Sequence, residues 1–574
     1  MKLSIHKLPV NGASHRDSAS VNEAPDRSCS GRETPDRVPR MTRDDSLTAA
    51  QMDGQALGWL ACLAGLIVLL IQTGGLGNPD TRGRWQVTRW LWTDEPQTYE
   101  RVFSAPGRGG ARYAMWGVGQ SVVMLPGDWI GAALSRRIAS PELKDRIREA
   151  LVAVVTFPLL DAFAVVLAAL FLREIGFPRR AWILGSLGLL LASSFLKYCQ
   201  NHQENSLMDL LTFAGAWGVL RWRNTGSRGA LIAGISALGM GLLVRLPFAA
   251  VSVGILAAVL LSLKNATSVS SSRTDVRWRE FVMIAFLVTA FWIGVERGYH
   301  FLRFGAWSGS YITAMAGALR AEDPTLPAGW PFSGNITEGF IGPLITPQRG
   351  VFFYDPLVLL PFMTGLAYVG SKLRLYPRFL VCAAAAFLLQ VAFHAPHFTW
   401  EGAGNWANRF TLVPVHLFVC LAVAATAVAW PNLTRLRRAA VLGLVTLSVA
   451  IQLGSVVYPD ALEDYAPGTH HKANGLAFDR PVWLVGYRWK SIWENVKGVE
   501  PTVPAVRALR RVHWWPALIG WQWPRLTWPA WTGWGCLLVL AGFSAGRLTR
   551  IARNPSTGLE QTAAKTPGRD FRRT

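Results

Sequence analysis

The chain has 574 residues, of which 51% are hydrophobic and only 16% are charged, against about 25% charged in an average globular chain. Uncharged runs such as 54–79 and 410–433 are long enough for transmembrane helices, and this excludes an ordinary soluble protein. The net charge of +22 would indicate nucleic acid in a soluble protein, but here the basic residues lie in short loops between apolar runs, so the membrane explains them and no nucleic-acid partner is expected.

The two ends of the chain differ from its middle. Residues 1–53 are polar and rich in Ser, Asp, Arg and Pro, and we expect a disordered cytoplasmic tail because such a segment cannot bury a core. Residues 54–550 form the predicted transmembrane domain, which begins with an uncleaved anchor at about 56–72. Residues 551–574 form a basic cytoplasmic tail. The six cysteines share no metal-ligand spacing and predict neither a disulfide framework nor a zinc site.

The apolar periodicity predicts an all-α polytopic membrane protein with about twelve transmembrane helices. One further apolar stretch, 117–134, is interrupted by Pro126-Gly127-Asp128, and we interpret it as a juxtamembrane or re-entrant helix. The other predicted spans are at about 150–172, 180–197, 206–222, 229–245, 247–263, 280–296, 351–370, 379–394, 410–430, 439–457 and 531–546.

The distribution of Lys and Arg predicts the topology. Short basic loops alternate with outer segments if 117–134 does not cross the membrane, and both termini are then cytoplasmic. The segment 135–149, with five Lys/Arg, argues against this solution because it would lie outside. If 117–134 crosses, that objection disappears, but other basic loops become external. The preferred solution has outer loops at 76–149, 297–350 and 458–530.

The first outer loop carries an acidic pair, Asp94 and Glu95, within the polar and aromatic stretch 82–119. We predict Asp94 as a catalytic general base, with Glu95 as the second candidate, because a carboxylate in hydrogen-bond reach of a hydroxyl can take its proton. The alternative is an exposed Asp-Glu-Pro turn, since these residues are common in loops.

Further charged and aromatic residues gather at the predicted outer side. Ionisable residues at membrane depth are costly, so each is a candidate for function. Alternatives exist for single residues: an arginine can extend to the interface, Glu204 can cap a helix, and Glu401 can pair with Arg409. Several arginines beside carboxylates nevertheless indicate an anion site, since the guanidinium group binds phosphate in bidentate fashion. The predicted substrate-binding residues are Glu204, Arg245, Arg303, Arg349, Trp400, Glu401 and Arg409.

Three motifs in this order resemble a known class of enzymes. They are RFGAWSGSY, ITPQRGVFFYDPLVLLP and WEGAGNWANRFTLVPV. Their order and the predicted topology over about 55–550 resemble the GT-C class of polytopic glycosyltransferases, which includes the protein O-mannosyltransferases and the lipid A aminoarabinose transferase. The chain looks closest to a bacterial membrane branch of that class. It departs from the usual last motif at Ala403 and Asn408, where glycine or proline is more usual.

The resemblance implies a concrete reaction. Such enzymes transfer a sugar from a polyprenyl-phosphate donor to an extracytoplasmic glycan, lipid or protein acceptor, typically with inversion. Asp94 matches the base of the first outer loop, and arginines would stabilise the leaving phosphate. The resemblance also implies a bacterial cell membrane with the active site outside. No cofactor is expected, and the need for a divalent metal stays open.

A membrane transporter or lipid flippase is the alternative function, and a polysaccharide polymerase or ligase is a weaker one. A transporter more often shows related halves and polar sites at the middle of the membrane. The sequence shows no internal repeat, and Asp161 is the single midplane polar site that it indicates. The glycosyltransferase hypothesis is therefore preferred.

Overall fold

The structure is a computed structural model, and it describes residues 43–98, 104–264, 271–364, 369–370, 373–400, 402, 405–466 and 483–553. The chain divides into two units, Met1–Leu47 and Thr48–Thr574. Of the first unit only 43–47 are described, as the start of a helix, so most of the predicted N-terminal tail lies outside the described residues. The same holds for 554–574 of the predicted C-terminal tail.

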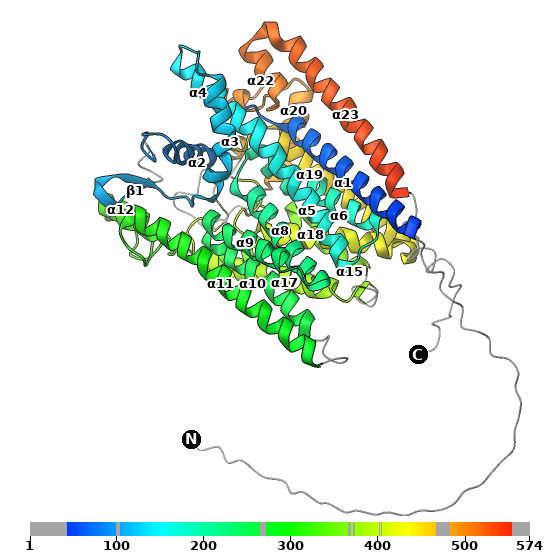
Figure 1. Cartoon of the computed structure of the whole chain (residues 1–574). Coiled ribbons are helices and arrows are strands. Elements are labelled where there is room, and N and C mark those ends of the chain that lie inside the picture. The colour runs from blue at the N-terminus through cyan, green and yellow to red at the C-terminus, as the bar shows by residue number, and fades with distance from the viewer. Residues whose placement is uncertain are drawn as a thin grey trace, which may run out of the picture. The chain divides into compact units, whose positions relative to one another are not determined.

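Helices make up most of the described part of the second unit (Figure 1). The strands in the described part are β1 (Ser104–Pro106) and β2 (Arg112–Ala114), which pair antiparallel. Within the described residues, eight helices are long and apolar enough to cross a membrane, and the chain is therefore an integral membrane protein with a mostly helical fold. These eight are Ala50–Ile71, Pro141–Ile175, Leu246–Leu263, Arg277–Phe304, Tyr376–His394, Leu412–Asn432, Arg435–Val457 and Pro524–Arg553.

The predicted number of about twelve spans is not confirmed. A ninth span arises if α6 (Arg179–Ala192) and α7 (Phe195–Asn201), which are bent by 57° at their junction, count as one. The predicted spans 206–222 and 229–245 fall in α8 (Glu204–Thr225), which begins and ends with charged residues, and in α9 (Arg228–Val244), which has 17 residues.

The predicted span 351–370 is also different. Its described part consists of three short helices rather than one long one, because Pro356 and Pro361 interrupt the helical hydrogen bonds. They are α14 (Val351–Tyr354), η4 (Pro356–Leu359) and α15 (Leu360–Thr364).

The apolar core lies where α5 (Phe157–Ile175), α8, α9 and α18 (Leu412–Ala429) pack together with α6. Small residues permit close helix contacts: a Cβ atom at Gly218 of α8 would lie 2.7 Å from the Cα atom of Gly234 on α9. Such contacts are typical of membrane helices, which associate through close packing rather than through a hydrophobic driving force.

Three helices between residues 76 and 151 are tied together by Asp128. They are α2 (Pro79–Trp90), α3 (Gly119–Leu134) and α4 (Pro141–Leu151). The fully buried carboxylate of Asp128 accepts hydrogen bonds from Arg148 at 2.8 and 3.1 Å and from the indoles of Trp85 and Trp92, each at 2.9 Å. The 16-residue α3 is not among the candidate spans, whereas α4 continues through a π-helical turn, Val152–Thr156, into α5.

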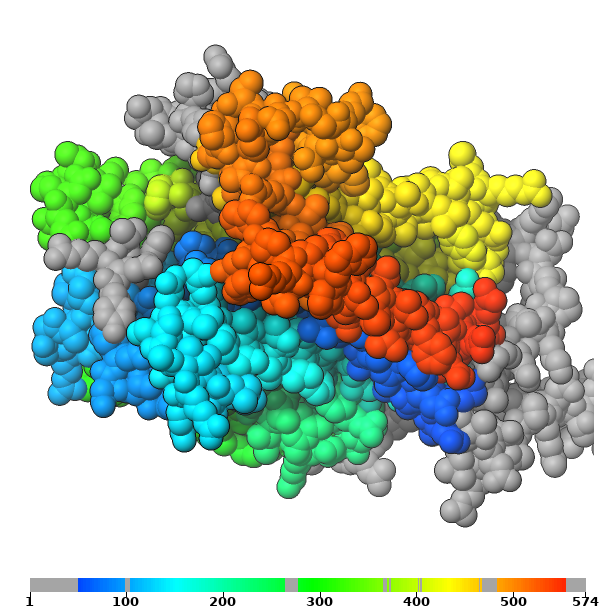
Figure 2. Space-filling model, turned by 90° about the horizontal axis from the view of Figure 1, so that it is seen from above, coloured from blue at the N-terminus to red at the C-terminus, as the bar shows by residue number. Residues whose placement is uncertain are grey.

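The first and last spanning helices, α1 (Arg43–Ile71) and α23 (Thr527–Arg553), lie side by side (Figures 1 and 2). Trp59 packs edge-on against Phe543, and the indole of Trp534 donates to the carbonyl of Leu70 at 2.9 Å. Trp59, in the middle of α1, meets Phe543 late in α23, whereas Leu70 at the end of α1 meets Trp534 early in α23. The two helices are therefore antiparallel.

The other described helices complete the bundle, and several of them contribute residues to this core. They are η1 (Arg108–Gly110), η3 (Leu246–Phe248), α10 (Ala249–Lys264), α11 (Ser271–Phe304), α12 (Tyr311–Glu322), α13 (Ile336–Ile345), α17 (Tyr376–His394), η5 (Trp430–Asn432), α19 (Arg435–Val457), η6 (Asp460–Tyr465), α20 (Leu484–Val496), α21 (Pro504–Leu509), α22 (Trp515–Gln522) and η8 (Pro524–Leu526).

Candidate functional site

The site begins at the N-terminus of α2, directly after the first span. Asn78 is the N-cap, and its side-chain oxygen accepts from the backbone N–H of Asp80 at 2.9 Å. Pro79 occupies the first helical position, which suits its fixed φ. Asp80 therefore stands in the first turn, where its carboxylate pairs with the guanidinium of Arg409, 329 residues later in the chain.

Next to this pair, Glu204 lies between two more arginines. Glu204 is the first residue of α8 and is buried. One carboxylate oxygen is 3.0 Å from Nη2 of Arg84, and the other is 3.5 Å from Nη1 of Arg245. Since Arg84 follows Asp80 by four residues on α2, both side chains lie on one helix face. We call Asp80, Arg84, Glu204, Arg245 and Arg409 the acid–arginine cluster.

The acid–arginine cluster has more hydrogen-bond donors than acceptors. Three arginines face two carboxylates. Nε and Nη1 of Arg84 and Nε of Arg409 are buried and have no hydrogen-bond partner among the described residues. The Arg84 side chain is only 5% exposed, so water has little access to these nitrogens. A buried donor without an acceptor costs free energy. An anionic ligand with several oxygens would satisfy these donors.

Aromatic residues hold the arginines of the cluster in place. The ring of Phe410 lies under both Arg245 and Arg409, with the guanidinium carbons 4.2 and 5.3 Å from the ring centre. Burial would lower the pKa of Arg409, but Asp80 and Glu204 outweigh it and raise that pKa. Burial raises the pKa of Tyr311, which the nearby Arg245 opposes, so this phenol stays neutral beside the cluster.

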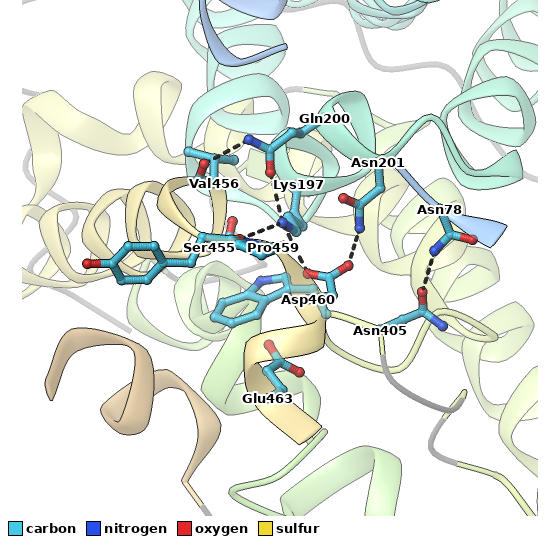
Figure 3. A network of polar contacts seen from close by, with 12 residues as sticks. Asn78, Lys197, Gln200, Asn201, Asn405, Ser455, Val456, Pro459, Asp460 and Glu463 are labelled. Carbon is cyan, nitrogen blue, oxygen red and sulfur yellow. Dashed lines mark hydrogen bonds and ion pairs between the residues drawn. The ribbon is translucent and has the colours of Figure 1, made fainter. Parts of the chain in front are cut away.

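A second buried network of charges lies beside the first. Lys197 on α7 is 3.0 Å from Asp460, and Arg488 on α20 is 3.0 Å from both Asp460 and Glu463. Arg349 completes the network at 3.1 Å from Glu463. In Figure 3, Lys197 contacts Asp460 from one side. Asp460 and Glu463 lie on the same short helix, η6.

Four consecutive residues, 201–204, connect the two networks. Asn201 donates to Asp460, Gln203 donates to Asn405, and Glu204 binds the arginines. Asn405 also accepts from Asn78 at 3.4 Å, a contact drawn in Figure 3. His202, with φ of 57°, provides the left-handed turn between α7 and α8. The start of α2 is therefore held against the second network.

The structure unites three of the predicted substrate-binding residues, Glu204, Arg245 and Arg409, in the acid–arginine cluster. Arg349 belongs to the second network. Arg303 instead holds the segment after β2, since it donates to the carbonyls of Ala114 at 2.8 Å and Trp116 at 3.2 Å.

Two predicted residues contribute less. Trp400 is buried against α13, where a Cβ atom at Gly342 would lie 2.2 Å from its ring. Glu401 lies outside the described residues, so its predicted pairing with Arg409 is not tested. Asp80 takes the position beside Arg409 instead.

The predicted bases lie at the other end of α2. Asp94 is exposed, and Glu95 pairs with Arg89. Because α2 has 12 residues, its length of about 18 Å separates Asp94 from Asp80. Sequence reasoning missed Asp80 and Arg84, although Asn78-Pro79-Asp80 is a recognisable helix start.

The interior of the bundle is more polar than the sequence indicates. Ser194 lies 3.0 Å from Nε2 of His416, whose Nδ1 is 2.7 Å from Asp209. This resembles a nucleophilic triad, but all three are fully buried, and Ser194 also donates to Asp355 at 2.8 Å. The group therefore stabilises the bend between α6 and α7. Asp161 is therefore not the only fully buried polar residue of the bundle among the described residues, and its predicted place at the middle of the membrane stays a prediction.

No protein-family model and no curated protein matches the chain. Within the described residues, no group of three or more His, Cys, Asp or Glu side chains could hold a metal ion. The chemistry of the site therefore has to be argued from the geometry of the acid–arginine cluster.

Proposed function

We propose that the chain is a membrane glycosyltransferase with a GT-C-like bundle that transfers a sugar from a polyprenyl-phosphate donor to an extracytoplasmic acceptor, with inversion, in a bacterial cell membrane. The observation that carries the proposal is the acid–arginine cluster at the end of the first span. It combines a carboxylate, Asp80, with arginine donors that have no acceptor.

In this proposal Asp80 is the general base. The acceptor hydroxyl attacks the anomeric carbon and gives its proton to the Asp80 carboxylate, while the bond from that carbon to the phosphate oxygen breaks. The negative charge that develops on the phosphate is stabilised by Arg84, Arg245 and Arg409. Asp94 remains the second candidate, and its distance from the arginines is the argument against it.

An apolar groove supports a lipid-linked donor. It has a volume of about 160 Å³ and lies between α13, α14, α17 and α18, with a lining of apolar side chains that includes Val351, Phe387 and Pro414. Pro414 of this groove follows Arg409 of the acid–arginine cluster by five residues in the chain. A lipid tail would lie in this groove while the phosphate reaches the arginines.

The direct experiment supplies the purified protein in lipid nanodiscs with labelled polyprenyl-phosphate sugars and a panel of acceptors. The expected result is a labelled product together with free polyprenyl phosphate. A flippase, which is the alternative function, would instead move the labelled donor across sealed vesicles without cleaving it. This alternative is tested as well because the group around His416 is polar and buried inside the helix bundle, as polar sites of transporters often are.

A matched pair of variants tests the arginines. Arg84→Gln removes buried donors of the acid–arginine cluster, and we expect transfer to fall by roughly 10²–10³-fold, as when a transition-state donor is lost. Arg82→Gln is the control, since Arg82 lies on the same helix but is 59% exposed and pairs with Glu149. Equal activity of both variants would contradict phosphate binding by Arg84.

A further inference from the structure

A cleft of about 630 Å³ lies between α1, α6 and α23, away from the acid–arginine cluster. Its walls are mainly apolar, with Leu63, Ile183, Leu187 and Leu548 among them, and two arginines, Arg180 and Arg553, also line it. The volume lies within the range of about 300–1,000 Å³ that is typical of ligand pockets. The apolar walls and the two cations call for an occupant that is partly apolar and partly anionic.

The arginines of the cleft lie at the membrane surface opposite to Asp80. Trp534 of α23 bonds to Leu70, at the end of α1 that leads to Asp80. Arg553 follows 19 residues later on the same helix, a rise of about 28 Å, which is close to the thickness of the hydrocarbon core. Arg180 is in the first turn of α6.

The two arginines are exposed, and within the part of the chain that the structure describes no carboxylate pairs with them. The carboxylate of Asp53 lies nearby, but it already pairs with Arg179 at 2.6 Å and with Arg173 at 3.4 Å. The mouth of the cleft therefore keeps a positive charge that no described residue neutralises.

We propose that this cleft binds an anionic phospholipid, with an acyl chain between α1, α6 and α23 and the phosphate at Arg180 and Arg553. Basic pockets between membrane helices at the cytoplasmic side bind anionic lipid head groups for this reason. The walls of the cleft are continuous with the spanning helices, so a lipid enters from the bilayer. The following segment, 554–574, is polar and basic, so its net positive charge does not complement the positive charge of the cleft.

Native mass spectrometry of the full chain with phosphatidylglycerol or phosphatidylcholine tests the proposal. We expect phosphatidylglycerol to be retained in preference to phosphatidylcholine, and retention to fall roughly fivefold in Arg180→Gln and again in Arg553→Gln. Arg547→Gln is the matched control: it removes the same charge from α23, but Arg547 packs on Phe543 and does not line the cleft. This control should retain the lipid as the unmodified chain does.

A second variant separates the cleft from surface charge. Ala545→Trp fills the cleft without changing any charge, and we expect it to abolish phosphatidylglycerol retention while gel filtration and circular dichroism stay unchanged. Equal retention of both lipids by the unmodified chain would overturn the proposal. So would losses in Arg180→Gln and Arg553→Gln that are no larger than the loss in Arg547→Gln.

Discussion

At the scale of single residues, the buried arginines differ in how completely the protein satisfies them. All three nitrogens of Arg488 are engaged, by Glu463, Asp460 and backbone carbonyls. Arg84 binds one carboxylate and leaves two nitrogens without an acceptor within the described residues. A satisfied arginine stabilises the fold, whereas an unsatisfied one can bind a ligand at no loss of internal hydrogen bonds. This difference separates Arg488 of the second network from Arg84 of the acid–arginine cluster.

Asp460 of the second network and the neighbouring His513 predict a loss of stability in acid. Burial and the positive charge of Lys197 lower the pKa of His513 from 6.5 to about 4. Burial would raise the pKa of Asp460, but Lys197 and Arg488 outweigh it and hold that pKa below its usual value. Both groups therefore take up protons more readily in the unfolded state, so stability falls as the pH falls. For His513 the loss occurs between pH 6.5 and about 4.

Thermal unfolding of the detergent-solubilised protein at pH 7 and pH 5 checks this. The melting temperature should be lower at pH 5, and His513→Gln, which cannot gain a proton, should show a smaller difference. An identical difference in both proteins would show that His513 does not contribute.

At the scale of elements, Asp128 positions α2 and with it Asp80. In the sequence, Pro126-Gly127-Asp128 interrupts the apolar stretch 117–134, but the helix α3 continues through these three residues. A Cβ atom at Gly127 would lie 2.6 Å from Oγ1 of Thr156 and 3.0 Å from Cα of Val152, so glycine permits the close approach of α3 to the π-helical turn between α4 and α5. The apparent break is a packing contact.

Asp128→Asn should destabilise the protein by roughly 3–5 kcal/mol, because it leaves Arg148 buried without its carboxylate. The control is Glu142→Gln, which breaks the exposed pair of Glu142 and Arg146 on α4 and should cost about 0.5 kcal/mol or less. Chemical denaturation of the two variants compares these costs. Similar losses for both would show that the buried pair is not essential to the first outer loop.

The sequence allows some parts of the site to be predicted and not others. Arg245 and Arg409 are charged residues beside long apolar runs, so the sequence alone predicts that they belong to a buried site. Asp80 was missed because a helix cap explains its local pattern and because its partner, Arg409, is 329 residues away. Arg303 and Arg349 show the same local signal as Arg245, and only tertiary contacts separate their structural roles from binding.

At the scale of the whole transmembrane unit, the antiparallel pair of α1 and α23 constrains the topology. The start of α1 and the end of α23 lie at the same membrane surface, so the number of crossings is even. Eight spans satisfy this condition. If the bent pair of α6 and α7 crosses, one further helix crosses too, and α8 and α9 are the available candidates.

Reporter fusions at the two termini should therefore show both on the same side, and the basic residues at the end of α23 predict that this side is the cytoplasm. Reporters on opposite sides would exclude an antiparallel arrangement of α1 and α23. The same result would contradict the placement of the lipid cleft at the cytoplasmic surface and of the acid–arginine cluster at the opposite surface.

The central claim is that Asp80, rather than Asp94, is the base of a sugar transfer at the end of the first span. The rate of transfer from a labelled polyprenyl-phosphate sugar, measured for Asp80→Asn and Asp94→Asn side by side, tests it most directly. We expect Asp80→Asn to lower the rate by roughly 10²–10⁴-fold, as for the loss of a general base, and Asp94→Asn to leave it nearly unchanged. A nearly normal rate in Asp80→Asn together with a large loss in Asp94→Asn would contradict the account.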